Sequence, residues 1–202
     1  MEQQLLNLKS TRAAQARWGK RIGQTGYKLL LAVSGLSLFG GLFVLFFEGS
    51  HYGYLLLALA VSCYMKAVWW KRRLSVLPPD GTDLNGRLSG ELLALLKPGT
   101  PQQPQAVWQA LTPHWQARFF GNHLLLPKDT VSGSLSTDPA ALGQALQVAV
   151  QLADKNQSPT VEPGFVVAGL LLTSPNIRQL LTQLKARPED VEAVADWLGR
   201  GL

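Results

Sequence analysis

Cysteine is nearly absent from this chain of 202 residues, in which Cys63 is the only one. A single cysteine excludes a disulfide framework within the chain, and it leaves a thiolate metal site without further ligands. This scarcity agrees with a reducing compartment around the soluble part of the protein, because disulfides are rare there.

The sequence also lacks the motifs of several enzyme classes. It contains no Gly-x4-Gly-Lys-Ser/Thr phosphate loop, His-Glu-x-x-His pair, Cys-x-x-Cys pair or Gly-x-Ser-x-Gly elbow. His114 and His123 are nine residues apart, which is not a compact metal-ligand spacing, and His51 stands alone. Glu189 and Asp190 are expected in the first turn of a helix, where carboxylates stabilise the helix dipole. We therefore predict a protein that is not an enzyme and has no cofactor or metal.

Charge is scarce in two apolar runs. The first run covers residues 29–47, LLLAVSGLSLFGGLFVLFF, and has no charged residue. The second run begins at Tyr54 and is interrupted only by Lys66. Nineteen residues in a helix rise about 28 Å, close to the roughly 30 Å hydrocarbon core of a bilayer. The sequence predicts a transmembrane hairpin over residues 27–70, with spans at about 29–47 and 53–70.

Basic residues flank these runs on the side away from their connecting loop. Residues 1–79 carry ten Lys and Arg against two Glu, whereas residues 80–202 carry nine basic and eleven acidic residues. The positive-inside rule therefore predicts an inner-membrane protein with both termini in the cytoplasm. The basic charge indicates contact with lipid headgroups, and its absence from the soluble part argues against a nucleic-acid partner. The predicted membrane-interface anchors are Trp18, Lys66, Trp69, Trp70, Lys71, Arg72 and Arg73.

Residues 1–26 are predicted to form a basic N-terminal arm. This arm is expected to be helical to about Arg21 and broken by GQTG at 23–26. Two roles are open: an amphipathic helix on the headgroups, or a solvated flank that only sets topology. Lys9, Arg12 and Arg17 interrupt the apolar face and favour the second role. Residues 71–86, with Pro78-Pro79, are predicted to be a linker.

Small residues recur on both spans at spacings that let helices approach closely. Their first expected use is packing the two spans against each other, and homo-oligomerisation through the same faces is a second use. These residues are Ser34, Ser37, Gly40, Gly41, Ala58 and Ser62.

Residues 87–202 show helical periodicity without an alternating strand pattern. The clearest helix is predicted at 140–154, and the short apolar stretch 164–172 should be a buried central helix. The stretch 130–139 is expected to be a loop that closes on Thr137 or Asp138 as N-cap, with Pro139 at the first helical position. The predicted fold class is all-α, a transmembrane hairpin followed by a small orthogonal α-helical bundle.

Residues 141–198 contain an ordered set of short motifs. Ala141, Ala145 and Ala149 recur at a spacing of four, a polar loop leads to Val161-Glu162, and Gly169-Leu170-Leu171 follow. This order resembles one repeat of the Clp N-terminal domain of Clp-type AAA unfoldases. Pro163 stands where the family usually has histidine, and the preceding residues match a first repeat only loosely. The resemblance implies a module that recruits substrate polypeptides or adaptors to a Clp-type unfoldase or protease. The motor would be a separate protein or would follow Leu202. The alternative is a membrane scaffold or assembly protein whose helical domain docks a partner.

Aromatic residues supply the candidate protein-binding contacts. Trp108 and Trp115 are seven residues apart, which is two turns of one helical face, and Phe119 and Phe120 follow. Core packing is the first interpretation of this pattern. The alternative is a peptide-binding groove, because aromatic anchors are common at protein-binding surfaces.

Overall fold

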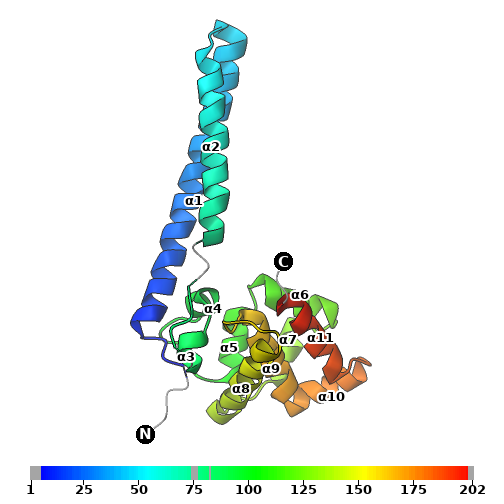
Figure 1. Cartoon of the computed structure of the whole chain (residues 1–202). Coiled ribbons are helices and arrows are strands. Elements are labelled where there is room, and N and C mark those ends of the chain that lie inside the picture. Colours follow the sequence, from blue (N-terminus) through cyan, green and yellow to red (C-terminus); the bar gives the residue numbers. More distant parts are fainter. Residues whose placement is uncertain (1–5, 74–76, 82, 200–202) are drawn as a thin grey trace. The chain divides into compact units, whose positions relative to one another are not determined.

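The computed structural model describes residues 6–73, 77–81 and 83–199, without the side chains of residues 70–73. The described residues form helices joined by loops, and no strand occurs among them, which confirms the all-α prediction (Figure 1). The chain divides into two compact units. One is a helical hairpin, Gln15–Leu77; the other joins the residues up to Ala14 with Pro78–Leu202, and we call it the helical domain.

The hairpin consists of two antiparallel helices. Helix α1 (Thr11–Phe43) continues into a π-helical turn, η1 (Val44–Glu48), Gly49 adopts φ 61°, and α2 covers Tyr52–Arg73. Both helices are long and apolar enough to cross a membrane. The predicted break at residues 23–26 is wrong, because each glycine costs a helix only about 1 kcal/mol and the helix runs through the stretch.

Small residues set the register of the two hairpin helices. The Ser34 hydroxyl donates to the Ala60 carbonyl at 2.8 Å. A Cβ on Gly41 would lie 2.9 Å from the Gly53 carbonyl oxygen. Both pairs belong to the same antiparallel register, which also places Lys66 level with Lys28. The small residues predicted on the first helix therefore pack against the second, as expected. On the second helix, however, the predicted Ala58 and Ser62 are exposed, and Gly53 and Ala60 form the contact instead.

The helical domain is built around one buried helix. Helix α9 is buried from Pro163 to Leu172 and contacts α5, α6, α8, α10 and α11, which confirms the predicted central helix. The helices of this domain are α3 (Leu84–Arg87), α4 (Gly90–Leu95), α5 (Pro104–Leu111), α6 (Trp115–His123), α7 (Lys128–Ser134), α8 (Pro139–Lys155), α9 (Pro163–Thr173), α10 (Pro175–Gln183) and α11 (Pro188–Gly199).

Helices α8 and α9 pack at close range because α9 has a glycine at their crossing. A Cβ on Gly169 would collide with the Ala145 carbonyl of α8 and would lie 3.3 Å from the Ala149 nitrogen. Helix α8 begins as predicted: the Asp138 carboxylate accepts from the Ala140 N–H at 2.9 Å, and Pro139 is the first helical residue. Ion pairs from Lys155 to Glu192 (3.0 Å) and Asp196 (3.4 Å) join the end of α8 to α11.

Two local predictions for this domain are wrong. Residues 130–134, the first half of the loop predicted at 130–139, belong to helix α7. Val131 is fully buried, and its side chain offsets the weak helix propensity of the surrounding serines and glycine. Trp108 and Trp115 do not share one helical face. Helix α5 ends at Leu111, and Trp115 begins α6.

The N-terminal segment belongs to the helical domain, which differs from both predicted roles of the arm. Leu6, Leu8 and Ala13 are buried, at 2%, 5% and 0% exposed. The Arg12 guanidinium donates to the carbonyls of Pro78 (2.6 Å) and Leu88 (3.2 Å). The described residues on both sides of the hairpin are thus held in a single unit.

Candidate functional site

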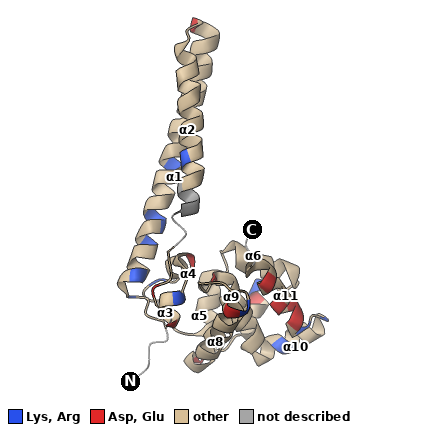
Figure 2. Ribbon diagram, viewed as in Figure 1, with Lys and Arg blue, Asp and Glu red and all other residues tan. Residues whose placement is uncertain are grey.

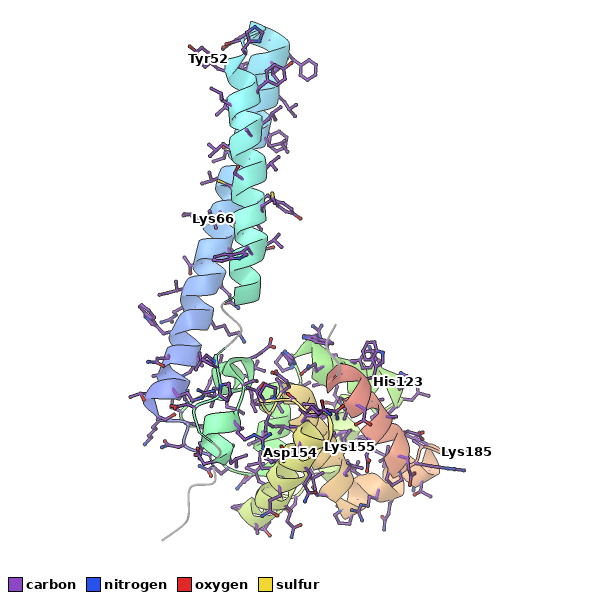
Figure 3. All side chains as sticks on the ribbon, in the orientation of Figure 1. Tyr52, Lys66, His123, Asp154, Lys155 and Lys185 are labelled. Atoms are coloured by element: carbon purple, nitrogen blue, oxygen red, sulfur yellow. The ribbon has the colours of Figure 1, made fainter. Side chains whose placement is uncertain are left out.

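A groove of about 650 Å³ opens between α6 and α11, and we call it the α6/α11 groove. Its walls come from the end of α6, the turn after it, the α10–α11 connection and one face of α11. The lining residues are Phe119, His123, Leu124, Leu125, Leu184, Lys185, Ala186, Asp190, Ala193, Val194 and Trp197. Figure 3 labels His123 and Lys185.

Stacked aromatic rings line one wall of this groove. The rings of Phe119 and Trp197 stack with centroids 4.8 Å apart, and His123 stacks on Phe119 at 5.6 Å. Trp197 is 48% exposed and Leu125 is 74% exposed. Large apolar side chains that gather in an exposed concavity are typical of protein-binding surfaces.

The backbone at both turns of the groove is strained. Leu125, after α6, has φ 54°, and Lys185, after α10, has φ 58°. In each case the next residue's N–H donates to a carbonyl five residues back, which is the hydrogen bond of a Schellman turn. Glycine is the usual residue there, and a larger side chain costs roughly 1–2 kcal/mol. Gln157, which does not line the groove, has the same conformation and the same hydrogen bond, so these turns shape the groove without by themselves marking it as a site.

The four predicted contact residues separate into two groups. Trp108 and Phe120 are core residues, at 2% and 0% exposed, in keeping with the core-packing interpretation. Phe119 is half-buried and lines the groove, and Trp115 is 43% exposed but is not among the lining residues. Sequence reasoning did not assign Trp197 to a site. Its signal is its place on α11 outside the buried stripe of Val191, Val194 and Ala195.

The predicted interface anchors fall on the hairpin. Trp18 and Trp69 are 69% and 51% exposed, and Lys66 is exposed at the level of Lys28. Figure 2 shows the hairpin's Lys and Arg away from its turn, where Glu48 lies. From Lys28 to Glu48 the helix rises about 30 Å without a charge. The side chains of Trp70, Lys71, Arg72 and Arg73 lie outside the described residues.

A cluster of polar side chains surrounds the beginning of α9. His114 Nε2 lies 2.9 Å from Glu91 Oε1, and the buried Gln116 amide accepts from the Gly164 N–H at 2.8 Å. Glu162 accepts from the Thr160 hydroxyl at 3.0 Å. Within the described part of the chain, no group of three or more His, Cys, Asp or Glu side chains is arranged to hold a metal ion. These groups connect α4, α6 and α9, so their evident role is structural.

Burial raises the pKa of Glu162 above its usual value of 4.5, and the nearby Glu91 carboxylate acts in the same direction. Hydrogen bonds from Thr160 and Ser89 and the charge of His114 partly offset this rise. The folded state therefore holds the Glu162 proton more tightly than the unfolded state does. The resulting stability is present below the unfolded pKa and is lost as pH rises through the folded pKa.

Glu162→Gln should consequently stabilise the protein at neutral pH. Glutamine stays uncharged and keeps an oxygen that accepts from Thr160. We expect the midpoint of thermal unfolding to rise by roughly 2–4 °C at pH 7, equivalent to about 1 kcal/mol, and the difference to vanish near pH 4. Thermal melts between pH 4 and pH 8 measure this. A lower midpoint at pH 7 would show that the charged carboxylate stabilises the fold through His114.

No protein-family model, curated protein or solved structure matches this chain.

Proposed function

We propose that this protein is a membrane-anchored protein-binding module without catalytic activity of its own. Its hairpin spans the inner membrane with both ends in the cytoplasm, and its helical domain captures apolar segments of partner polypeptides in the α6/α11 groove. The observation that carries this proposal is the exposed Phe119–Trp197 stack within a concave apolar surface.

Two features of the hairpin support the membrane part of the proposal. An uncharged apolar band of bilayer thickness lies between the turn and the level shared by Lys28 and Lys66. The residues on both sides of the hairpin belong to one compact unit, which supports two spans with both ends on the same side of the membrane. The basic residues at these ends favour the cytoplasmic side.

The groove's composition supports an apolar polypeptide as the occupant. Its wall offers Phe119, Trp197, Leu125 and Leu184, whereas the charged groups in its lining are Lys185 and Asp190. Such a surface binds apolar side chains and leaves polar ones in solvent, which suits segments exposed in unfolded proteins or on adaptors.

The resemblance of residues 141–198 to a Clp N-domain repeat extends the proposal to a partner. The bound polypeptide would be delivered to a Clp-type unfoldase, and the helical domain would have the family's orthogonal bundle arrangement. Residues 1–202 contain no phosphate loop, so the motor would be another protein or would follow Leu202.

Binding of a permanently unfolded polypeptide tests the groove directly. We expect the full chain in nanodiscs to bind fluorescein-labelled casein. Trp197→Ser should raise the dissociation constant at least 30-fold, which corresponds to the loss of an interface hot spot of about 2 kcal/mol. Trp115→Ser is the matched control, since it removes an equally exposed tryptophan outside the groove. Equal losses in both variants, or no binding by the wild type, would exclude the α6/α11 groove as the capture site.

A further inference from the structure

We infer that the helical domain contains a second peptide-binding site, which its own N-terminal segment occupies. Residues 6–9, which we call the strap, are seated on a surface that recognises a short non-helical leucine-x-leucine segment. The strap is thus an intramolecular competitor of such segments in partner proteins. This site is separate from the α6/α11 groove and involves different residues.

The strap is held as a bound peptide is held. Leu6 and Leu8 are 2% and 5% exposed, whereas Asn7 and Lys9 between and after them are exposed. The Leu8 N–H donates to the Leu6 carbonyl at 3.0 Å, so a tight turn directs both leucines to one side. Two apolar anchors separated by one polar residue therefore carry the side-chain recognition.

Side-chain amides of the domain recognise the backbone of the strap. Gln102 Oε1 accepts from the Leu6 N–H at 3.2 Å, and Gln102 Nε2 donates to the Leu6 carbonyl at 2.9 Å. Asn85 Oδ1 accepts from the Asn7 N–H at 2.9 Å. These bonds involve main-chain atoms that every peptide offers, so another segment with the same leucine spacing presents the same groups.

The surface also has space that the strap does not fill. A cavity of about 220 Å³ is lined by Leu6, Leu8, Lys9 and the turn at residues 98–100, together with Gln102. The turn is closed by the Thr100 N–H on the Lys97 carbonyl and by the Lys97 N–H on the Thr100 hydroxyl, each at 3.0 Å. The wall is therefore preformed, and the cavity beside it accommodates side chains larger than those of the strap.

Arg12, in the first turn of α1, permits local release of the strap. Arg12 remains attached to the carbonyls of Pro78 and Leu88 through its own hydrogen bonds, so the strap can leave without displacing the start of α1. Because the strap is tethered, its effective concentration is in the millimolar range. A free peptide consequently binds weakly to the wild type and more tightly once the strap is disabled.

The test uses the labelled peptide LNLKS, with the sequence of residues 6–10, and the full chain in nanodiscs. We expect Leu6→Ser/Leu8→Ser to bind this peptide at least tenfold more tightly than the wild type. Adding Gln102→Ala to that variant should remove at least tenfold of the affinity. Adding Gln105→Ala should not, because Gln105 lies on α5 and its N–H donates to the Ser136 carbonyl. The peptide NLLKS, with adjacent leucines, is the control ligand.

A folded double variant that binds LNLKS no better than the wild type, or binds NLLKS equally well, would overturn the inference and leave the strap a purely structural element. Circular dichroism establishes folding. If the double variant does not fold, Leu8→Ala replaces it with the same expected order of affinities, and failure of that variant to bind the peptide is equally decisive.

Discussion

Replacement of Gly169 by valine should remove most of the stability of the helical domain. A Cβ at this position collides with the Ala145 backbone carbonyl of α8, so the two helices must separate or distort. Backbone cannot move aside as a flexible side chain does, and α9 is the element against which α5, α6, α8, α10 and α11 pack. We expect a loss of about 3–5 kcal/mol, which is a large share of the roughly 5–15 kcal/mol typical of a domain.

Urea unfolding of the full chain in detergent, followed by tryptophan fluorescence, measures this loss. Gly133→Ala, in helix α7, is the control, because its Cβ would meet no other helix or side chain of the described residues within 4 Å beyond its own chain neighbours. Alanine should stabilise that helix by roughly 0.5–1 kcal/mol. A Gly169→Val protein with unchanged stability would show that α8 and α9 do not cross as closely as the structure places them.

Cysteine labelling should show that the hairpin turn and the helical domain lie on opposite sides of the membrane. In a Cys63→Ser background, we expect His51→Cys, at the hairpin turn, to react with a membrane-impermeant maleimide on intact cells. Gln144→Cys, on an exposed position of α8, should react only after lysis. The physical reason is the uncharged band of about 30 Å, which separates the turn from the basic ends.

Several results of this labelling would contradict the proposed topology. Labelling of both cysteines on intact cells would place the helical domain outside, and protection of both would show that the turn does not cross the membrane. Extraction of the protein from membranes by carbonate would exclude spanning altogether. Total labelling after lysis in detergent serves as the control for reactivity.

Features that are local in the sequence were predictable. The membrane-length apolar parts of the two hairpin helices follow from their apolar runs, and α8 begins where Asp138 and Pro139 provide a cap and a first helical residue. The burial of α9 follows from apolar residues on every side of a short helix. The errors arose where tertiary packing overrode local preference: Val131 stabilises α7 in a stretch rich in turn-forming residues, and the glycines at 23 and 26 do not end α1.

The candidate sites were only partly predictable, because their members come from distant parts of the chain. Phe119 was identified as a candidate contact, but its stacking partner Trp197 lies in the last helix. Gln102 and the Leu6 that it binds are 96 residues apart. Apolar periodicity indicates which face of a helix is buried, but it contains no information about which other segment covers that face.

The sequence by itself thus determined the all-α class, a membrane-length apolar hairpin and the position of the central helix, because these depend on contiguous residues and on the helical repeat. Only the tertiary structure decided that Trp108 and Phe120 are core residues while Phe119 meets Trp197 at the surface. It also decided that the N-terminal strap belongs to the domain after the hairpin. The physical reason is that these arrangements depend on packing and hydrogen bonds between segments far apart in the sequence. Local sequence patterns do not predict which of these segments come into contact.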